Sequence, residues 1–149
     1  MTQSRTLTAI ERAAIGWECE RLIHHYAMLN DAGDFAAMAE MFAEDGVFAR
    51  PTQADVPIRG KAAILAAYAS RPPRFTRHLI TSVVVTVEDQ DNARAHSYLT
   101  LHTGQPGEGL PRPAEPAYLI GDFKDRFVRN DGVWKFSERL GSLALKVGG

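Results

Sequence analysis

Residues 78–103, "HLITSVVVTVEDQDNARAHSYLTLHT", give the clearest indication of the fold in this chain. Residues 78–88 are rich in β-branched side chains, and residues 93–103 alternate between polar and apolar side chains. The polar run between them, "EDQDN", has the composition of a turn. The stretch therefore predicts two long antiparallel strands joined by a hairpin.

Two further strands are predicted on the C-terminal side of this hairpin, at residues 118–129 and 133–145. The "NDG" sequence at 130–132 between them is typical of a tight hairpin turn. Residues 104–117 hold four prolines and three glycines, so we expect a loop there. Its length is more typical of a rim or lid over a binding site than of a linker.

The first third of the chain predicts helices. Thr8 and Glu11 have the spacing of a capping box, and apolar residues recur at helical spacing over 10–29. Gly33 can take the left-handed conformation that ends a helix. Asp34 can then cap a second, short helix.

The second helix is expected to carry Phe35, Met38 and Phe42 and to end at "EDG", residues 44–46. "VFAR" at 47–50 is a short strand candidate, and residues 60–70 predict a third helix that two prolines terminate. Three helices followed by four long strands predict an α+β protein with a mostly antiparallel sheet. If that sheet curves strongly, it and the helices enclose a cone with an open mouth.

Length and composition narrow the class of protein. With 149 residues, 45% hydrophobic and 23% charged, we expect one globular domain over 1–149. The net charge of -1 gives no indication of nucleic acid or an anionic membrane as a partner. There is neither a run long enough to span a membrane nor a signal-peptide pattern. The single cysteine, Cys19, excludes an internal disulfide and fits a buried site in a cytoplasmic protein.

Two strand histidines are candidate functional residues, each with two interpretations. His78 shares a predicted strand face with Ile80, and is either a hydrogen-bonded core residue or a catalytic group. His96 and Tyr98 share a polar face, which lies either in solvent or in a polar cavity. The strand pattern alone leaves both questions open.

Helix residues supply the other candidates. Tyr26 lies on the apolar stripe of the first helix, as a core aromatic or as a site residue. Asp31 lies at the helix C-terminus, where the helix dipole disfavours a carboxylate. A histidine could compensate, or Asp31 could make turn bonds. The spacing of histidines and carboxylates gives no metal motif, so we expect neither a metal nor a cofactor.

The chain also resembles a known family. "HHYAMLNDAGDFAAMAEMFAEDGVF", "RGKAAILAAY", "RHLITSVVV", "NARAHSYL" and "DRFVRNDGVWKFSER" resemble the SnoaL-like branch of the nuclear transport factor 2-like (NTF2-like) superfamily. The resemblance covers roughly residues 8–142. It implies a cone of three N-terminal helices packed on a strongly curved, mixed sheet, and scytalone dehydratase is the member with the greatest likeness.

That resemblance implies roles for particular residues. It places a general-base histidine at His78 and a second histidine at His96, paired with Asp31. The two tyrosines that hold the substrate in scytalone dehydratase correspond to Asn30 and Phe48. A serine and an asparagine of that enzyme correspond to Gly121 and Phe123, so its acid–base residues match while its substrate-holding residues differ.

Other residues complete the predicted site. The resemblance makes Tyr26 a substitute for the missing tyrosines. Tyr98, on the polar strand face, is an alternative donor to the substrate oxygen. The pocket wall is expected to include Trp17, Phe42, Phe48, Tyr68, Leu79 and Phe123.

The resemblance implies a cofactor-free lyase that eliminates water β to a carbonyl of a cyclic or aromatic-like small molecule. The alternatives are an isomerase or cyclase with the same base, and a non-catalytic binding protein like the β subunits of ring-hydroxylating dioxygenases. We also expect a homodimer or homotrimer, with Val83, Val85, Leu99 and Leu101 on a covered outer sheet face. Arg139 is expected to lie at the surface rather than at the pocket rim.

Overall fold

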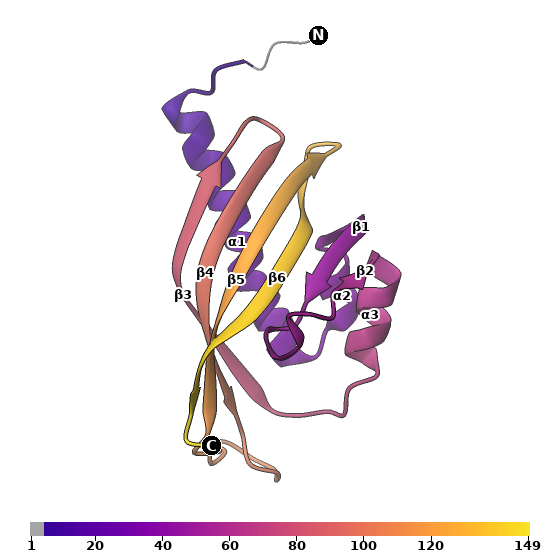
Figure 1. Ribbon diagram of the computed structural model, residues 1–149, viewed down its shortest axis with the longest axis vertical. Coiled ribbons are helices and arrows are strands. Elements are labelled where there is room, and N and C mark those ends of the chain that lie inside the picture. Colours follow the sequence, from indigo (N-terminus) through magenta and orange to yellow (C-terminus); the bar gives the residue numbers. More distant parts are fainter. Residues whose placement is uncertain (1–4) are drawn as a thin grey trace.

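A computed structural model describes residues 5–149 and contains one curved six-stranded sheet with helices on its concave side (Figure 1). The strand order is β2-β1-β6-β5-β4-β3, and all neighbouring pairs are antiparallel except β1 and β6. The α+β expectation with a mixed, mostly antiparallel sheet is therefore confirmed. The strands are β1 Phe42–Ala49, β2 Ile58–Arg59, β3 Thr76–Val87, β4 Asn92–Thr103, β5 Tyr118–Asn130 and β6 Val133–Val147.

The first helix, α1 (Ala9–Ala32), crosses the sheet and packs mainly on β3. Thr8 accepts a hydrogen bond from the backbone of Glu11, and the Glu11 side chain accepts one from the Thr8 backbone, which confirms the capping box. Gly33 ends the helix in the left-handed region with φ 74°. This well-defined end fixes the position of Asn30 and Asp31 beside the sheet.

The second helix is shorter than expected. α2 (Phe35–Ala39) starts at the Asp34 cap as predicted, but Phe42 opens β1 and does not belong to the helix. The "EDG" sequence lies within β1, where the pairing with β6 is irregular between Phe42 and Val47. The prediction was wrong because a bulge accommodates polar and glycine residues within a strand. The third helix, α3 (Lys61–Ala69), agrees with its prediction.

A β-bulge in β3 changes which side chains face the helices. The register with β4 shifts between Thr81 and Val84, and Ser82 adopts a positive φ of 53°. Val83 and Val85 consequently pack against the core, whereas Val84 is exposed. Strict alternation from His78 would place Val84 on the inner face, and an inserted residue reverses that parity.

On β4 the apolar face turns inward and the polar face outward. Leu99 is buried and Leu101 packs against the core, while His96 and Tyr98 are exposed on the convex face. The expectation that Val83, Val85, Leu99 and Leu101 form a covered outer face was therefore wrong. Assembly into a homodimer or homotrimer stays a prediction.

Aromatic side chains fill the space between α1, β1 and β6. Phe42 and Phe136 have ring centroids 5.4 Å apart, and Phe136 lies 5.7 Å from Tyr26. Cys19 is fully buried in the same core, as expected for a small apolar residue, and burial raises its thiol pKa to about 12. No helix within residues 5–149 is both long enough and apolar enough to cross a membrane.

The link between β1 and α3 bears directly on the site. It begins with a short 3-10 helix, η1 (Pro51–Gln53), which packs on β6. A Cβ at Gly141 would lie 2.7 Å from Pro51, so only glycine allows this close approach. The contact holds Arg50 and Pro51 at the edge of the concave face.

Candidate active site

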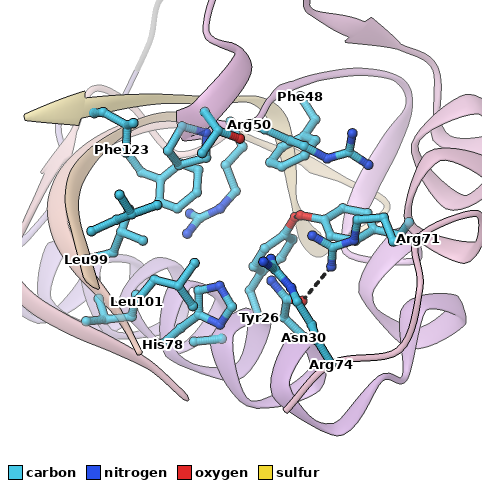
Figure 2. A pocket seen from close by; sticks show the side chains of 18 residues that line it. Tyr26, Asn30, Phe48, Arg50, Arg71, Arg74, His78, Leu99, Leu101 and Phe123 are labelled. Atoms are coloured by element: carbon cyan, nitrogen blue, oxygen red, sulfur yellow. Dashed lines mark hydrogen bonds between the residues drawn. The ribbon is translucent and has the colours of Figure 1, made fainter. Parts of the chain in front are cut away.

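A cavity of about 100 Å³ opens on the concave side of the sheet, between α1, α3 and η1 (Figure 2). Leu99, Leu101 and Phe123 form its apolar sheet wall, and His78 stands beside them. Tyr26 and the arginine-bearing segments lie across from this wall. The complete lining is Tyr26, Ala27, Asn30, Phe48, Arg50, Pro51, Thr52, Tyr68, Arg71, Arg74, His78, Ile80, Leu99, Leu101, Leu119, Phe123, Arg139 and Leu143.

His78 and Asp31 form a hydrogen-bonded pair at the cavity. The Nδ1 atom of His78 lies 2.6 Å from Oδ1 of Asp31, and both side chains are only about one-tenth exposed. The His78 backbone N–H donates to Oδ2 at 3.0 Å, and the Thr76 hydroxyl donates to Oδ1 at 2.9 Å. The C-terminal end of α1 is therefore joined to the start of β3 through one carboxylate.

These bonds determine the charge of Asp31 and the tautomer of His78. Burial raises the pKa of Asp31, but hydrogen bonds from the ring and backbone of His78 and from Thr76 outweigh it, so the pKa is lowered. An ionised Asp31 can only accept hydrogen bonds, so Nδ1 of His78 carries the proton. Nε2 makes no hydrogen bond within residues 5–149, so in the neutral ring its lone pair can accept a proton from a ligand.

Two tyrosine hydroxyls meet at the other side of the cavity. Tyr26 on α1 and Tyr68 on α3 lie 2.7 Å apart, oxygen to oxygen, and both side chains are buried. Burial raises both pKa values, most strongly for Tyr26, so both groups stay protonated. Because one hydroxyl donates to the other, one O–H of the pair is left to bond a ligand oxygen.

Arg139 on β6 is fully buried at the cavity floor. Its Nη1 lies 2.7 Å from Oδ2 of Asp125, and its guanidinium carbon lies 3.8 Å from the ring centre of Phe123 and 4.5 Å from that of Tyr26. Burial raises the pKa of Asp125 to about 6, against the influence of Arg139. The expectation of a surface Arg139 was wrong, because in the β6 register it pairs with Asp125 on the concave face.

The structure gathers six of the predicted site residues around the cavity, and Asp31 lies directly behind one of them. The six lining residues are Tyr26, Asn30, Phe48, Tyr68, His78 and Phe123. Their roles stay predictions.

Two predicted polar residues lie elsewhere. His96 is on the convex face, with Nε2 2.6 Å from Oδ2 of Asp122, so the expected pairing of Asp31 with His96 is wrong. Tyr98 is 46% exposed on the same face and stacks edge-on against His96. The resemblance placed His96 inside the cavity and Tyr98 was expected beside the substrate, but the apolar residues on the other face of β4 are the ones that face the core.

Three predicted wall residues are also absent from the lining. Trp17 is 64% exposed on the outer side of α1, and Leu79 is 51% exposed because it follows His78 on a strand and points to the opposite face. Phe42 is buried in the aromatic core. Residues 104–117 do form a loop, but none of them lines the cavity.

Four arginines in the lining were not predicted as a group: Arg50, Arg71, Arg74 and Arg139. They come from the residue after β1, from the segment after α3 and from β6, and only the folded chain brings them together. Within residues 5–149, no group of three or more His, Cys, Asp or Glu residues has the arrangement of a metal site. The groups at the cavity that can carry charge near neutral pH are therefore arginine side chains and the His78–Asp31 pair.

An open cone containing one histidine–aspartate pair and an apolar wall is an architecture of small-molecule-binding α+β proteins. The profile of the SnoaL-like domain matches residues 11–140, and the chain therefore belongs to the SnoaL-like family, within the NTF2-like superfamily. The resemblance recognised in the sequence is confirmed.

Solved structures agree on the fold. A candidate scytalone dehydratase from Novosphingobium aromaticivorans aligns with TM-score 0.77 and 20% identity, over 94% of this chain and 91% of the other. The hexachlorocyclohexane dehydrochlorinase LinA type 2 aligns with TM-score 0.77 and 15% identity, over 94% and 92%. An NTF2-like protein with a cystatin-like fold from N. aromaticivorans aligns with TM-score 0.68 and 25% identity, over 85% and 79%. No curated protein sequence matches this chain significantly.

Proposed function

We propose that this protein is a cofactor-free lyase that removes a proton next to a carbonyl and expels water from the β carbon of a cyclic small molecule. The observation that carries the proposal is the Asp31–His78 pair, whose free Nε2 belongs to a residue lining an apolar cavity. A neutral imidazole held in one tautomer is suited to act as a general base near pH 7.

The proton balance needs only His78. Nε2 takes the proton from the α carbon, which leaves an enolate on the substrate and an imidazolium on the protein. The ionised Asp31 stabilises that imidazolium through Nδ1–H. The imidazolium then returns the proton to the departing β-hydroxyl, so water leaves and a conjugated carbonyl compound remains.

The negative charge of the enolate has donors on the other side of the cavity. The Tyr26–Tyr68 pair has one O–H to give, and the buried Arg139 guanidinium lies against Tyr26. Donors fixed in advance in a partly dry site stabilise developing charge far better than the same groups in water. Phe48, Leu99 and Phe123 provide the apolar surface against which a flat ring would pack.

Two related protein structures support a chemistry that begins with proton removal. One is the candidate scytalone dehydratase and the other the dehydrochlorinase. Both names describe loss of a small group together with a proton. An isomerase or cyclase would use the same base without a leaving group, and a binding protein would have no need of the free Nε2.

The test compares variants with a panel of cyclic β-hydroxy ketones, both neutral and carboxylated, beginning with 3-hydroxy-1-tetralone. Dehydration of that compound gives 1-naphthol, which is followed by absorbance, and deuterium entering the α position from D₂O is followed by NMR. The wild type should accelerate both, and His78→Gln should lose about 100-fold or more. The matched control is His96→Gln, which removes an exposed histidine–aspartate pair from the convex face and should keep full activity.

The possible outcomes separate the three classes of function. Exchange without loss of water would identify an isomerase or cyclase. Absence of His78-dependent exchange and of dehydration across the panel would refute a carbon-acid enzyme and favour a binding protein.

A further inference from the structure

One wall of the cavity carries more positive charge than the proposed proton transfer uses. Arg50 follows β1, and Arg71 and Arg74 flank the two prolines after α3. All three line the cavity, and in Figure 2 Arg71 and Arg74 lie beside Asn30 and Tyr26, across from Leu99 and Leu101. The prolines restrict the backbone between Arg71 and Arg74 and so limit how far the two can separate.

These charges have no counter-ion within the described part of the chain. Among residues 5–149, no carboxylate oxygen lies within 4.0 Å of Arg50, Arg71 or Arg74, whereas Arg139 is paired with Asp125. In the same part of the chain, the residues that line the cavity include no aspartate or glutamate. Asp31 borders the same segment, but its oxygens accept hydrogen bonds from Thr76 and His78. The protein therefore leaves this positive charge unneutralised.

Internal contacts orient the guanidinium groups without using all their donors. Arg50 donates Nη2–H to the Ala67 carbonyl, and Arg71 donates Nη2–H to Asn30 at 3.2 Å. The Arg71 guanidinium carbon lies 4.5 Å from the ring centre of Tyr68. The Nε–H groups of Arg50 and Arg71 are buried without an acceptor, so the protein does not saturate either side chain.

Positive charge gathered against its own repulsion is a feature of anion-binding sites. Burial lowers the pKa of Arg71, and nearby Arg74 and Arg50 lower it further, although Tyr68 opposes them. An anion at this wall would relieve the repulsion and accept hydrogen bonds from the Nη–H groups of Arg71 and Arg74 that have no acceptor within residues 5–149. Guanidinium groups bind planar carboxylates particularly well, because two parallel N–H donors match the two oxygens.

We propose that the natural ligand of this cavity carries a carboxylate, which binds at Arg50, Arg71 and Arg74 while the rest of the molecule extends toward His78. For the reacting end of the ligand, this inference rests on the proposed function. For the charged end, it rests on the cluster of Arg50, Arg71 and Arg74. The substrate would thus be a cyclic hydroxy-keto acid rather than a neutral ketone.

The test measures binding, so it does not require turnover. Three probe pairs are titrated at pH 7 and low salt while ¹H–¹⁵N NMR spectra of the protein are followed: benzoate with benzamide, cinnamate with cinnamamide, and 2-naphthoate with 2-naphthamide. At this pH the acids are ionised, and each amide has nearly the same shape without the charge. At least one acid should bind about tenfold or more tightly than its amide, and the difference should shrink as salt is added.

Variants test whether the preference for acids over amides depends on the arginines that line the cavity. Arg74→Gln and Arg71→Gln should each reduce the acid-to-amide preference several-fold. Arg74 is exposed and makes no side-chain hydrogen bond or ion pair within residues 5–149, so its replacement should not affect folding. The matched control is Arg77→Gln, which removes an exposed arginine that stacks on Phe75 and does not line the cavity.

Several results would overturn the inference. It fails if no acid binds more tightly than its amide, or if the preference survives both Arg71→Gln and Arg74→Gln. If phenyl phosphate binds more tightly than benzoate and this binding depends on Arg74, the natural ligand carries a phosphate ester and not a carboxylate. His78→Gln separates the two proposals, because it should abolish proton exchange while the preference for acids remains.

Discussion

Replacing Asp31 with asparagine should reverse the tautomer of His78. In the wild type the carboxylate accepts three hydrogen bonds, from Thr76 Oγ1 at 2.9 Å, His78 N at 3.0 Å and His78 Nδ1 at 2.6 Å. An amide has one oxygen and one NH₂ group in the same space. It therefore cannot accept from both the ring and the backbone of His78 in this geometry.

The size of the effect follows from the bond that the amide must lose. If its oxygen faces Nδ1–H, the NH₂ group faces the His78 backbone N–H, and the mismatch costs about 1–3 kcal/mol. If the amide turns over, NH₂ faces Nδ1, and the ring must move its proton to Nε2. The reactive tautomer should therefore become about 5- to 150-fold less favoured. Turnover should fall about 100- to 10,000-fold, because the imidazolium also loses its anionic partner.

Long-range ¹H–¹⁵N NMR correlations report the two ring nitrogens directly and need no substrate. The wild type should show a protonated Nδ1 and an unprotonated Nε2 at His78, and the pattern should reverse in Asp31→Asn. The control is Asp122→Asn, which should alter the signals of His96 alone. An unchanged His78 tautomer in Asp31→Asn would refute the orienting role of this carboxylate.

Two more predictions concern stability. Arg139→Met leaves the Asp125 carboxylate buried without its partner and should lower the free energy of unfolding, measured by urea titration, by about 3–5 kcal/mol. The double variant Arg139→Met/Asp125→Leu should recover much of this loss. A single variant as stable as the wild type would show that the ion pair is dispensable. The pKa of Asp31 in the folded state lies below its ordinary value of 3.8. The contribution of the ionised Asp31 to the free energy of unfolding is therefore complete above pH 3.8 and is lost as the pH falls through the pKa of the folded state. The stability advantage of the wild type over Asp31→Asn should therefore shrink as urea titrations move from pH 7 to pH 3, and a constant difference would contradict the stabilising bonds assigned to this carboxylate.

Local sequence signals predicted the structural features whose physical cause lies within a few neighbouring residues. The capping box at Thr8, the left-handed Gly33 and the "NDG" turn depend on residues within a few positions of one another, and each occurs where predicted. Hydrophobic periodicity located α1, and β-branched runs located the long strands. The predicted extent of α2 was wrong because Phe42 pairs with β6, which is distant from it in the sequence.

The candidate site was predictable only in part. His78 and Asp31 stood out individually, one as a histidine on an apolar strand face and the other as an acid at an unfavourable helix end. Which histidine joins Asp31 depends on how α1 lies across the sheet, and that placement selected His78 over His96. Strand alternation on β4 separated a polar from an apolar face but did not show which of them faces the helices, and the structure buries the alanine and leucine face.

Helices, long strands, most turns and the histidine and aspartate candidates could be predicted from the sequence alone, because propensity, capping and periodicity act over short distances. The orientation of each strand face and the partner of each polar side chain became clear only in the folded structure. The bulge at Ser82 reverses the strand parity, and the β5–β6 register buries Arg139 against Asp125. Packing also brings to one cavity wall Arg50, Arg71 and Arg74, which have no carboxylate partner within residues 5–149. Each of these depends on contacts between residues distant in sequence, whose relative positions are fixed only when the sheet and helices pack together.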